Sequence, residues 1–120
     1  MPVIESSEQN NNDIICIYPD MTRREELENN LALQEELSRM KNGEPYNAHT
    51  PEMYAWRDEV KKLLRRLNIT EYHESTMPEI TRQLLPNSAP DVFVEPPFHC
   101  DYGNLIYAEE GVFINFGCTV

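Results

Sequence analysis

The side chains best suited to acid–base or metal chemistry in this chain are a few histidines and cysteines. They are His49, His73, His99, Cys16, Cys100 and Cys118. The cysteines are odd in number and far apart, and no Cys-x-x-Cys motif occurs, so the sequence supports no zinc site. A histidine can serve as a general base. However, we expect solvated side chains at His49 and His73, and the remaining histidine, His99, lies in the last third of the chain.

The element that would position His99 is the last third of the chain, where apolar residues recur every six positions. One column holds Val94, Cys100, Ile106, Val112 and Cys118, and a second holds Ala108, Ile114 and Val120. This period fits neither an amphipathic helix nor an isolated hairpin. It fits short strands stacked as a parallel β-solenoid with small inward side chains. In such a column, a free cysteine is expected to act as a small hydrophobe.

Three helices are expected before this β region. The first runs from an N-cap at Thr22, with a capping box to Glu25, to about Lys41. The second begins at Thr50-Pro51, and the third follows a capping box from Thr76 to Glu79 and ends at Pro86. The apolar stripes comprise Leu27, Leu31, Leu37 and Met40 in the first helix, Met53, Trp56, Val60, Leu63, Leu64 and Leu67 in the second, and Ile80, Leu84 and Leu85 in the third. Trp56 is expected to be buried against Leu27, Leu31 or Leu37.

The fold class is therefore α+β, within at most one small domain. Residues 1–21 are expected to be a disordered or extended N-terminal extension, residues 22–86 a helical domain, and residues 87–120 an incomplete hexapeptide-repeat region. The apolar run from Ile14 to Tyr18 fits an edge strand, a docking segment or packing against the helices.

Two motifs resemble the maltose/galactoside O-acetyltransferase family of hexapeptide-repeat acyltransferases. One is Glu95-Pro-Pro-Phe-His-Cys-Asp-Tyr-Gly103 followed by Phe113-Ile-Asn-Phe116, which resembles the entry to the family's left-handed β-helix. The other is Gly43-Glu-Pro-Tyr-Asn-Ala48 and the helix to Asn68, which resembles its preceding helical domain. Together they cover residues 34–120 in the family's order.

The resemblance implies acetyl transfer from acetyl-CoA, as co-substrate, to a sugar hydroxyl, with a homotrimer as the assembly. It places sugar-acceptor contacts at Asp101, Phe113 and Asn115, where a carboxylate, an aromatic face and an amide suit a sugar. The family's catalytic histidine and acetyl-CoA site lie on later coils, so no catalytic residue is expected here. His99 stands where the family has Arg or Tyr and is expected at the surface or beside the sugar.

Departures from the family surround the acceptor positions. Ala108-Glu-Glu-Gly111 stands where the family reads Ile-Gly-x-Asn, Leu105 replaces an Asn, and Phe116-Gly117 replaces Phe-Asn. They indicate drift or a different acceptor. The basic group Lys61, Lys62, Arg65 and Arg66, which ends the second helix, has two interpretations. It compensates the helix dipole, or it contacts an anion such as a coenzyme A phosphate.

The expected function is thus that of the N-terminal portion of a sugar O-acetyltransferase, truncated after the first β-helix coil and inactive by itself. The alternative is a non-catalytic interaction module that associates with a complete homologue through the exposed coil. The net charge of −11 disfavours nucleic acid and anionic membrane surfaces as partners. The unpaired cysteines and the lack of an apolar leader or span predict a reduced, cytoplasmic setting.

Overall fold

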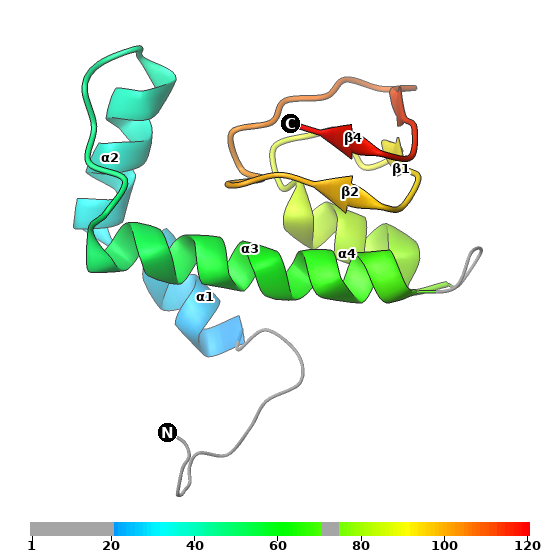
Figure 1. The fold of residues 1–120 in the computed structure, drawn as a ribbon, viewed down its shortest axis with the longest axis horizontal. Helices are drawn as coiled ribbons and strands as arrows, with labels where there is room; N and C mark the ends of the chain where they lie inside the picture. Colours follow the sequence, from blue (N-terminus) through cyan, green and yellow to red (C-terminus); the bar gives the residue numbers. More distant parts are fainter. Residues whose placement is uncertain (1–20, 71–74) are drawn as a thin grey trace, which may run out of the picture.

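The computed structural model describes residues 21–70 and 75–120, and Figure 1 shows the arrangement of their elements. The expectations for residues 1–20, including Cys16 and the run from Ile14 to Tyr18, and for His73 lie outside the described residues. The described helices are α1 (Met21–Glu28), α2 (Leu31–Lys41), α3 (Pro51–Ile69) and α4 (Met77–Leu84), and the strands are β1 (Phe93–Val94), β2 (Phe98–His99), β3 (Phe113–Ile114) and β4 (Cys118–Thr119).

The first expected helix is two helices, so the prediction of one helix from Thr22 to Lys41 is wrong. Asn30 has extended backbone angles, and its Oδ1 accepts a hydrogen bond from the Leu33 amide at 2.9 Å, which starts α2 afresh. Thr22 lies inside α1 rather than at its N-cap. The apolar face of α2 also differs from the predicted one. Leu33, which was not in the predicted stripe, is buried, whereas Leu31, which was, is 74% exposed.

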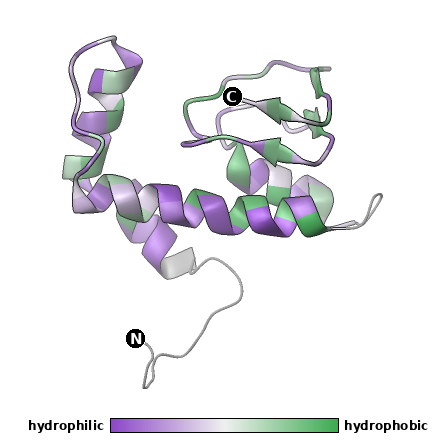
Figure 2. Cartoon of the chain, viewed as in Figure 1, coloured by the Kyte–Doolittle hydropathy of each residue, from purple (hydrophilic) through white to green (hydrophobic). Residues whose placement is uncertain are grey.

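Helix α3 follows the sequence expectation closely. Thr50 is its N-cap and accepts from the Met53 amide, and Pro51 is its first residue. The whole predicted stripe is buried, and Figure 2 shows apolar and polar residues alternating around this helix. Trp56 is 1% exposed and shares the core with Leu27 and Leu37 but not with Leu31, so its predicted burial is confirmed with that correction.

Helix α4 begins after Thr76, as predicted, with Pro78 in its first turn. Thr76 has helical backbone angles (φ −78°, ψ −16°), which differ from the extended geometry of a capping box. Ile80, Leu84 and Leu85 are buried as expected. The helix therefore forms from its apolar face and its proline rather than from the predicted cap.

The strands form two parallel pairs, β1 with β3 and β2 with β4. Phe93 lies opposite Phe113, and Phe98 lies opposite Cys118, so strands twenty residues apart in sequence are neighbours. A strict six-residue period would instead bring Val94 level with Val112, three repeats later. Helices followed by parallel strands agree with the expected α+β fold class. The left-handed β-helix stays a prediction, because each strand has only two residues.

Helices and strands share one hydrophobic core. In Figure 1, α3 and α4 lie along one side of the strand pairs. The largest fully buried apolar side chains are Leu33, Met53, Trp56, Val60, Leu63, Leu67, Ile80, Leu84, Val94 and Phe98. The helices thus cover the strand pairs on this side. None of the described helices has the length and apolarity needed to cross a bilayer.

Polar side chains join the N-terminal helix to this core. Arg24 is buried, lies 5.3 Å over the Trp56 ring and donates a hydrogen bond to the Gln83 carbonyl. Glu59, fully buried on α3, pairs with Arg23 and Lys62 at 3.2 Å each. A buried carboxylate is tolerated where cations neutralise it, so these contacts fix α1 against α3.

Candidate functional site

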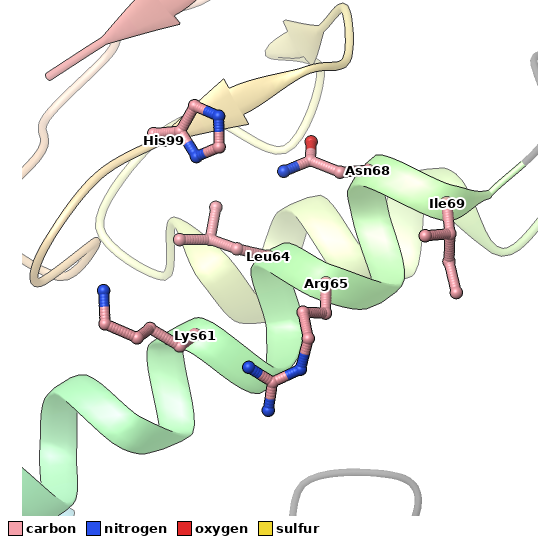
Figure 3. Close-up of a pocket in the computed structure, with 6 residues that line it drawn as sticks. All are labelled: Lys61, Leu64, Arg65, Asn68, Ile69 and His99. Atoms are coloured by element: carbon pink, nitrogen blue, oxygen red, sulfur yellow. The ribbon is translucent and has the colours of Figure 1, made fainter.

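A hollow lies between the second half of α3 and strand β2. It measures about 300 Å³ and is lined by Lys61, Leu64, Arg65, Asn68, Ile69 and His99. In Figure 3, Lys61, Leu64 and Asn68 extend from α3 on the side of β2, from which His99 projects. We call this cavity the larger hollow.

Asn68 sets the distance between the two walls of the larger hollow. Its Oδ1 accepts from the Phe98 amide at 2.9 Å, and its Nδ2 donates to the Phe98 carbonyl at 3.0 Å. Both ends of the amide are therefore used to hold β2 against α3. Because Phe98 points into the core, the next residue along the strand, His99, points out over the helix.

A second cavity, the smaller hollow, lies beside the first. It measures about 150 Å³ and is lined by Lys61, Leu64, His99, Cys100, Asp101, Thr119 and Val120. Lys61, Leu64 and His99 line both cavities, so the two hollows are neighbours. Asp101 supplies a carboxylate at the smaller hollow, whereas no carboxylate lines the larger one.

The basic residues at the end of α3 differ in their surroundings. Lys62 pairs with Asp58 at 3.7 Å and with Glu59 at 3.2 Å. Lys61 and Arg65 lie one turn apart, are exposed and make no ion pair within residues 21–70 and 75–120. Lys61 and Arg65 both line the larger hollow, and in Figure 3 the Arg65 side chain is directed away from His99.

Cys100 lines the smaller hollow and is a buried thiol. Burial raises its pKa to about 11, and the Gly103 backbone hydrogen bond and Lys61 only partly oppose this shift. The thiol therefore stays protonated and poorly nucleophilic near neutral pH. This agrees with the expectation that Cys100 acts as a small hydrophobe.

The turn after Asp101 is tied to α3 by residues that the sequence analysis did not single out. The Trp56 indole donates to the Tyr102 carbonyl at 3.2 Å, and the Arg57 guanidinium donates to the Tyr102 hydroxyl at 2.6 Å. Arg57 also donates to the Ala48 carbonyl. Spacing along the sequence gives no signal for contacts between residues 57 and 102.

Comparisons with known proteins agree with this architecture. Residues 39–88 match the family model of the maltose acetyltransferase hexapeptide capping motif. A crystal structure of a hexapeptide-repeat acetyltransferase from Vibrio cholerae, complexed with acetyl coenzyme A, is similar with a TM-score of 0.60 and 26% identity, over 70% of this chain and 45% of that one. This chain is therefore similar to the hexapeptide-repeat acetyltransferases.

Two curated relatives extend this acetyltransferase resemblance. A Saccharomyces cerevisiae protein named as a candidate acetyltransferase is 31% identical over 65% of this chain and 41% of its own length. Nodulation protein L of Rhizobium meliloti is 34% identical over 65% of this chain and 43% of its own length. The chain thus spans about two fifths of the curated relatives it matches. The predicted resemblance is confirmed.

The three predicted acceptor residues fall in two places in the structure. Asp101 is exposed at the smaller hollow. Phe113 is 57% exposed in β3 and stacks on Phe93, with ring centroids 5.6 Å apart. Asn115, exposed just after β3, accepts from the Phe116 amide at 2.8 Å. Asp101 follows one strand pair, and Phe113 and Asn115 belong to the other, so their joint action on a sugar stays a prediction.

The larger hollow by itself is too small for a whole acetyl-CoA molecule. The larger hollow has a volume at the lower limit of ordinary ligand pockets, and its polar groups suit one anionic group rather than a nucleotide, a diphosphate and a long thiol arm. In the part of the chain that the structure describes, no three histidine, cysteine or carboxylate side chains gather as metal ligands.

Proposed function

We propose that this chain forms the N-terminal portion of an acetyl-CoA-dependent O-acetyltransferase that acts on a sugar hydroxyl. The supporting observation is the order of its parts: a maltose acetyltransferase capping motif over residues 39–88 is followed directly by two parallel strand pairs. We also propose a cytoplasmic setting and a trimeric assembly for the complete enzyme, from the unpaired cysteines and the family resemblance respectively.

Acyl transfer from a thioester to a hydroxyl requires a base, donors for the oxyanion and a site for the acyl carrier. Within the proposal, this chain supplies part of the acceptor side. The Asp101 carboxylate accepts hydrogen bonds from sugar hydroxyls, the exposed Phe113 ring packs on the sugar's C–H face, and Asn115 both donates and accepts. The base and the carrier site belong to other coils.

The isolated chain is expected not to transfer acetyl groups. The measurement is release of free coenzyme A thiol from acetyl-CoA with maltose, a galactoside or glucose as acceptor. Because His99 does not align with the family's base, His99→Ala is expected to leave this background rate unchanged. Turnover above the uncatalysed rate that His99→Ala abolished would contradict both the inactivity and the non-catalytic role of His99.

The genetic context offers a second test of the proposal. A reading frame that continues past Val120 into further hexapeptide repeats with a histidine-bearing loop would support it. In that longer chain, Asp101→Ala is expected to lower kcat/KM for the sugar while leaving the KM for acetyl-CoA little changed. If Asp101→Ala weakened the binding of acetyl-CoA as much as that of the sugar, the variant would have a folding defect. That result would contradict an acceptor role for Asp101.

A second candidate function, an interaction module, is favoured by exposed apolar side chains around β3 and β4. Phe113, Phe116 and Val120 are 57%, 65% and 63% exposed. Unpaired strand edges beside apolar side chains promote association with another chain. This candidate predicts a stable complex with a complete homologue, which co-purification of the two chains tests.

A further inference from the structure

We propose that Arg57 is a positioning residue for the acceptor site. Its guanidinium holds the turn that follows β2, and this turn carries the Asp101 carboxylate. The inference rests on the proposed acceptor role of Asp101, and it gives α3 a part in that role. It begins with one side chain that contacts two segments far apart in the sequence.

The Arg57 guanidinium joins the loop before α3 to the turn after β2. Its Nη1 donates to the Tyr102 hydroxyl at 2.6 Å, and its Nη2 donates to the Ala48 carbonyl at 2.8 Å. The guanidinium carbon also lies 4.8 Å from the centre of the Tyr54 ring and 5.7 Å from the centre of the Tyr102 ring. Both distances fit cation–π contacts. One charged group therefore holds two segments of the chain together.

Arginine suits these contacts better than lysine does. The acceptors are a carbonyl oxygen and a phenol oxygen, and the planar guanidinium presents its N–H groups in a fixed fork. Lysine has one nitrogen on a flexible stem, so it cannot hold both oxygens in the same geometry. A hydrogen bond from a charged donor is also stronger than one from a neutral donor. The side chain of Arg57 therefore fixes the spacing between Ala48 and the Tyr102 ring.

The position of Asp101 depends on its neighbours, because Asp101 itself is exposed. On one side, Cys100 is buried in the core. On the other side, the Trp56 indole donates to the Tyr102 carbonyl at 3.2 Å, while Arg57 donates to the Tyr102 hydroxyl. Tyr102 is thus held at its backbone and at its ring. Loss of the contact at the ring is expected to let the turn move and to misplace the carboxylate.

Arg57 can be replaced without emptying the core, whereas Trp56 cannot. Trp56 is 1% exposed, so its truncation would destabilise the fold. Arg57 is only partly buried, and methionine keeps an unbranched apolar chain while removing every N–H donor. Arg57→Met therefore removes both hydrogen bonds, and Arg57→Lys keeps the charge but loses the fork. Arg82→Met is the matched control, because it makes the same substitution at an exposed position on α4.

The first experiment is amide NMR on the isotopically labelled chain, which needs no enzymatic activity. Arg57→Met is expected to shift the amides of Asp101 and Gly103, forty or more residues away in the sequence, whereas Arg82→Met leaves them unchanged. In the Tyr102→Phe background, which lacks the hydroxyl, Arg57→Met is expected to shift them less. Unchanged amides of Asp101 and Gly103 in Arg57→Met would overturn the inference, because the turn would then hold its place without the guanidinium.

The second experiment measures thiol release by the longer chain, with maltose, a galactoside or glucose as acceptor. Arg57→Met is expected to lower kcat/KM for the sugar about tenfold, the effect of losing one hydrogen bond to a charged group, and to leave the KM for acetyl-CoA unchanged. Arg57→Lys is expected to recover only part of this loss. Because Arg57 acts through Asp101, Arg57→Met is expected to cause no further loss in the Asp101→Ala background.

The combined variant separates positioning from a general structural role. A further tenfold loss in the Asp101→Ala background would show that Arg57 acts independently of Asp101. An unchanged kcat/KM in Arg57→Met, where Asp101→Ala lowers it, would show that the contact has no effect on the acceptor. Either result would overturn the inference and leave the proposed acetyltransferase function standing. Absence of thiol release from the unsubstituted longer chain would instead contradict the proposed function, and the inference with it.

Discussion

At the scale of single residues, one glycine decides how closely the β region approaches the helices. Gly103 has a φ of +59°, and a Cβ at this position would lie 2.2 Å from the Leu84 carbonyl oxygen. Such a contact with backbone cannot be relieved by a side-chain rotation. The Asp101–Gly103 turn can therefore sit on the end of α4 only with glycine, and this turn carries the carboxylate of the smaller hollow.

Gly103→Ala is expected to destabilise the fold more than Gly111→Ala. Both positions have a left-handed φ, which costs alanine about 1–2 kcal/mol. Gly111 has open space around it, whereas the clash at Gly103 adds about 1–3 kcal/mol. The free energy of unfolding from urea titrations measures the difference. An equal decrease of the free energy of unfolding in the two variants would show that α4 shifts to accommodate the new methyl group.

At the scale of elements, the break between α1 and α2 is the main departure from the expected helices. Asn30 caps α2, and the break lets α1 turn so that Arg24 reaches Trp56 and Arg23 reaches Glu59. In a single straight helix, Leu27 and Leu33 would lie about 120° apart around the axis, at opposite edges of one apolar stripe, whereas both are buried in the structure. The cap therefore determines where the apolar face of α2 points.

Asn30→Ala is expected to cost about 1 kcal/mol in the free energy of unfolding, the typical value of an N-cap. Asn29→Ala serves as the control, because Asn29 is exposed and only donates to the Glu25 carbonyl at the end of α1. Thermal and urea unfolding followed by circular dichroism give the two values. A loss at Asn29 equal to that at Asn30 would show that the sharp restart of α2 does not depend on the cap.

At the scale of the whole molecule, the helices cover only part of the β region. Val94, Phe98 and Cys100 are buried against α3 and α4, whereas exposure rises toward β3 and β4, where Phe113, Phe116 and Val120 face outward. In solenoid proteins each coil is stabilised by its neighbours. The face around β3 and β4 is therefore the part of the described surface most suited to contact with another chain.

Phe116→Lys is expected to reduce self-association while leaving the fold intact. Phe116 is 65% exposed, so its replacement removes apolar surface and adds a charge without emptying the core. Ile114→Lys is a poorer choice, because Ile114 is partly buried against the core. Sedimentation velocity over a range of concentrations measures the association. A wild-type chain that stays monomeric at the highest concentration would contradict this expectation and weaken the interaction-module alternative.

The sequence alone determined features that depend on local pattern. The stripe from Met53 to Leu67 predicted α3 correctly because a 3.6-residue period needs only neighbouring residues. Thr50-Pro51 predicted its start for the same reason. The six-residue period of small apolar residues indicated parallel strands, and two motifs indicated the hexapeptide-repeat acetyltransferase resemblance.

The tertiary structure decided what depends on contacts between distant residues. Pairing of Phe93 with Phe113 set a twenty-residue register that a six-residue period does not give. The separation of Lys62 from Lys61 and Arg65 depends on Glu59 being buried and on His99 lying across the helix, which no spacing along α3 reveals. The two hollows lie where Asn68 of α3 bonds the backbone of Phe98, thirty residues away, so their chemistry appears only after helix and strand have packed.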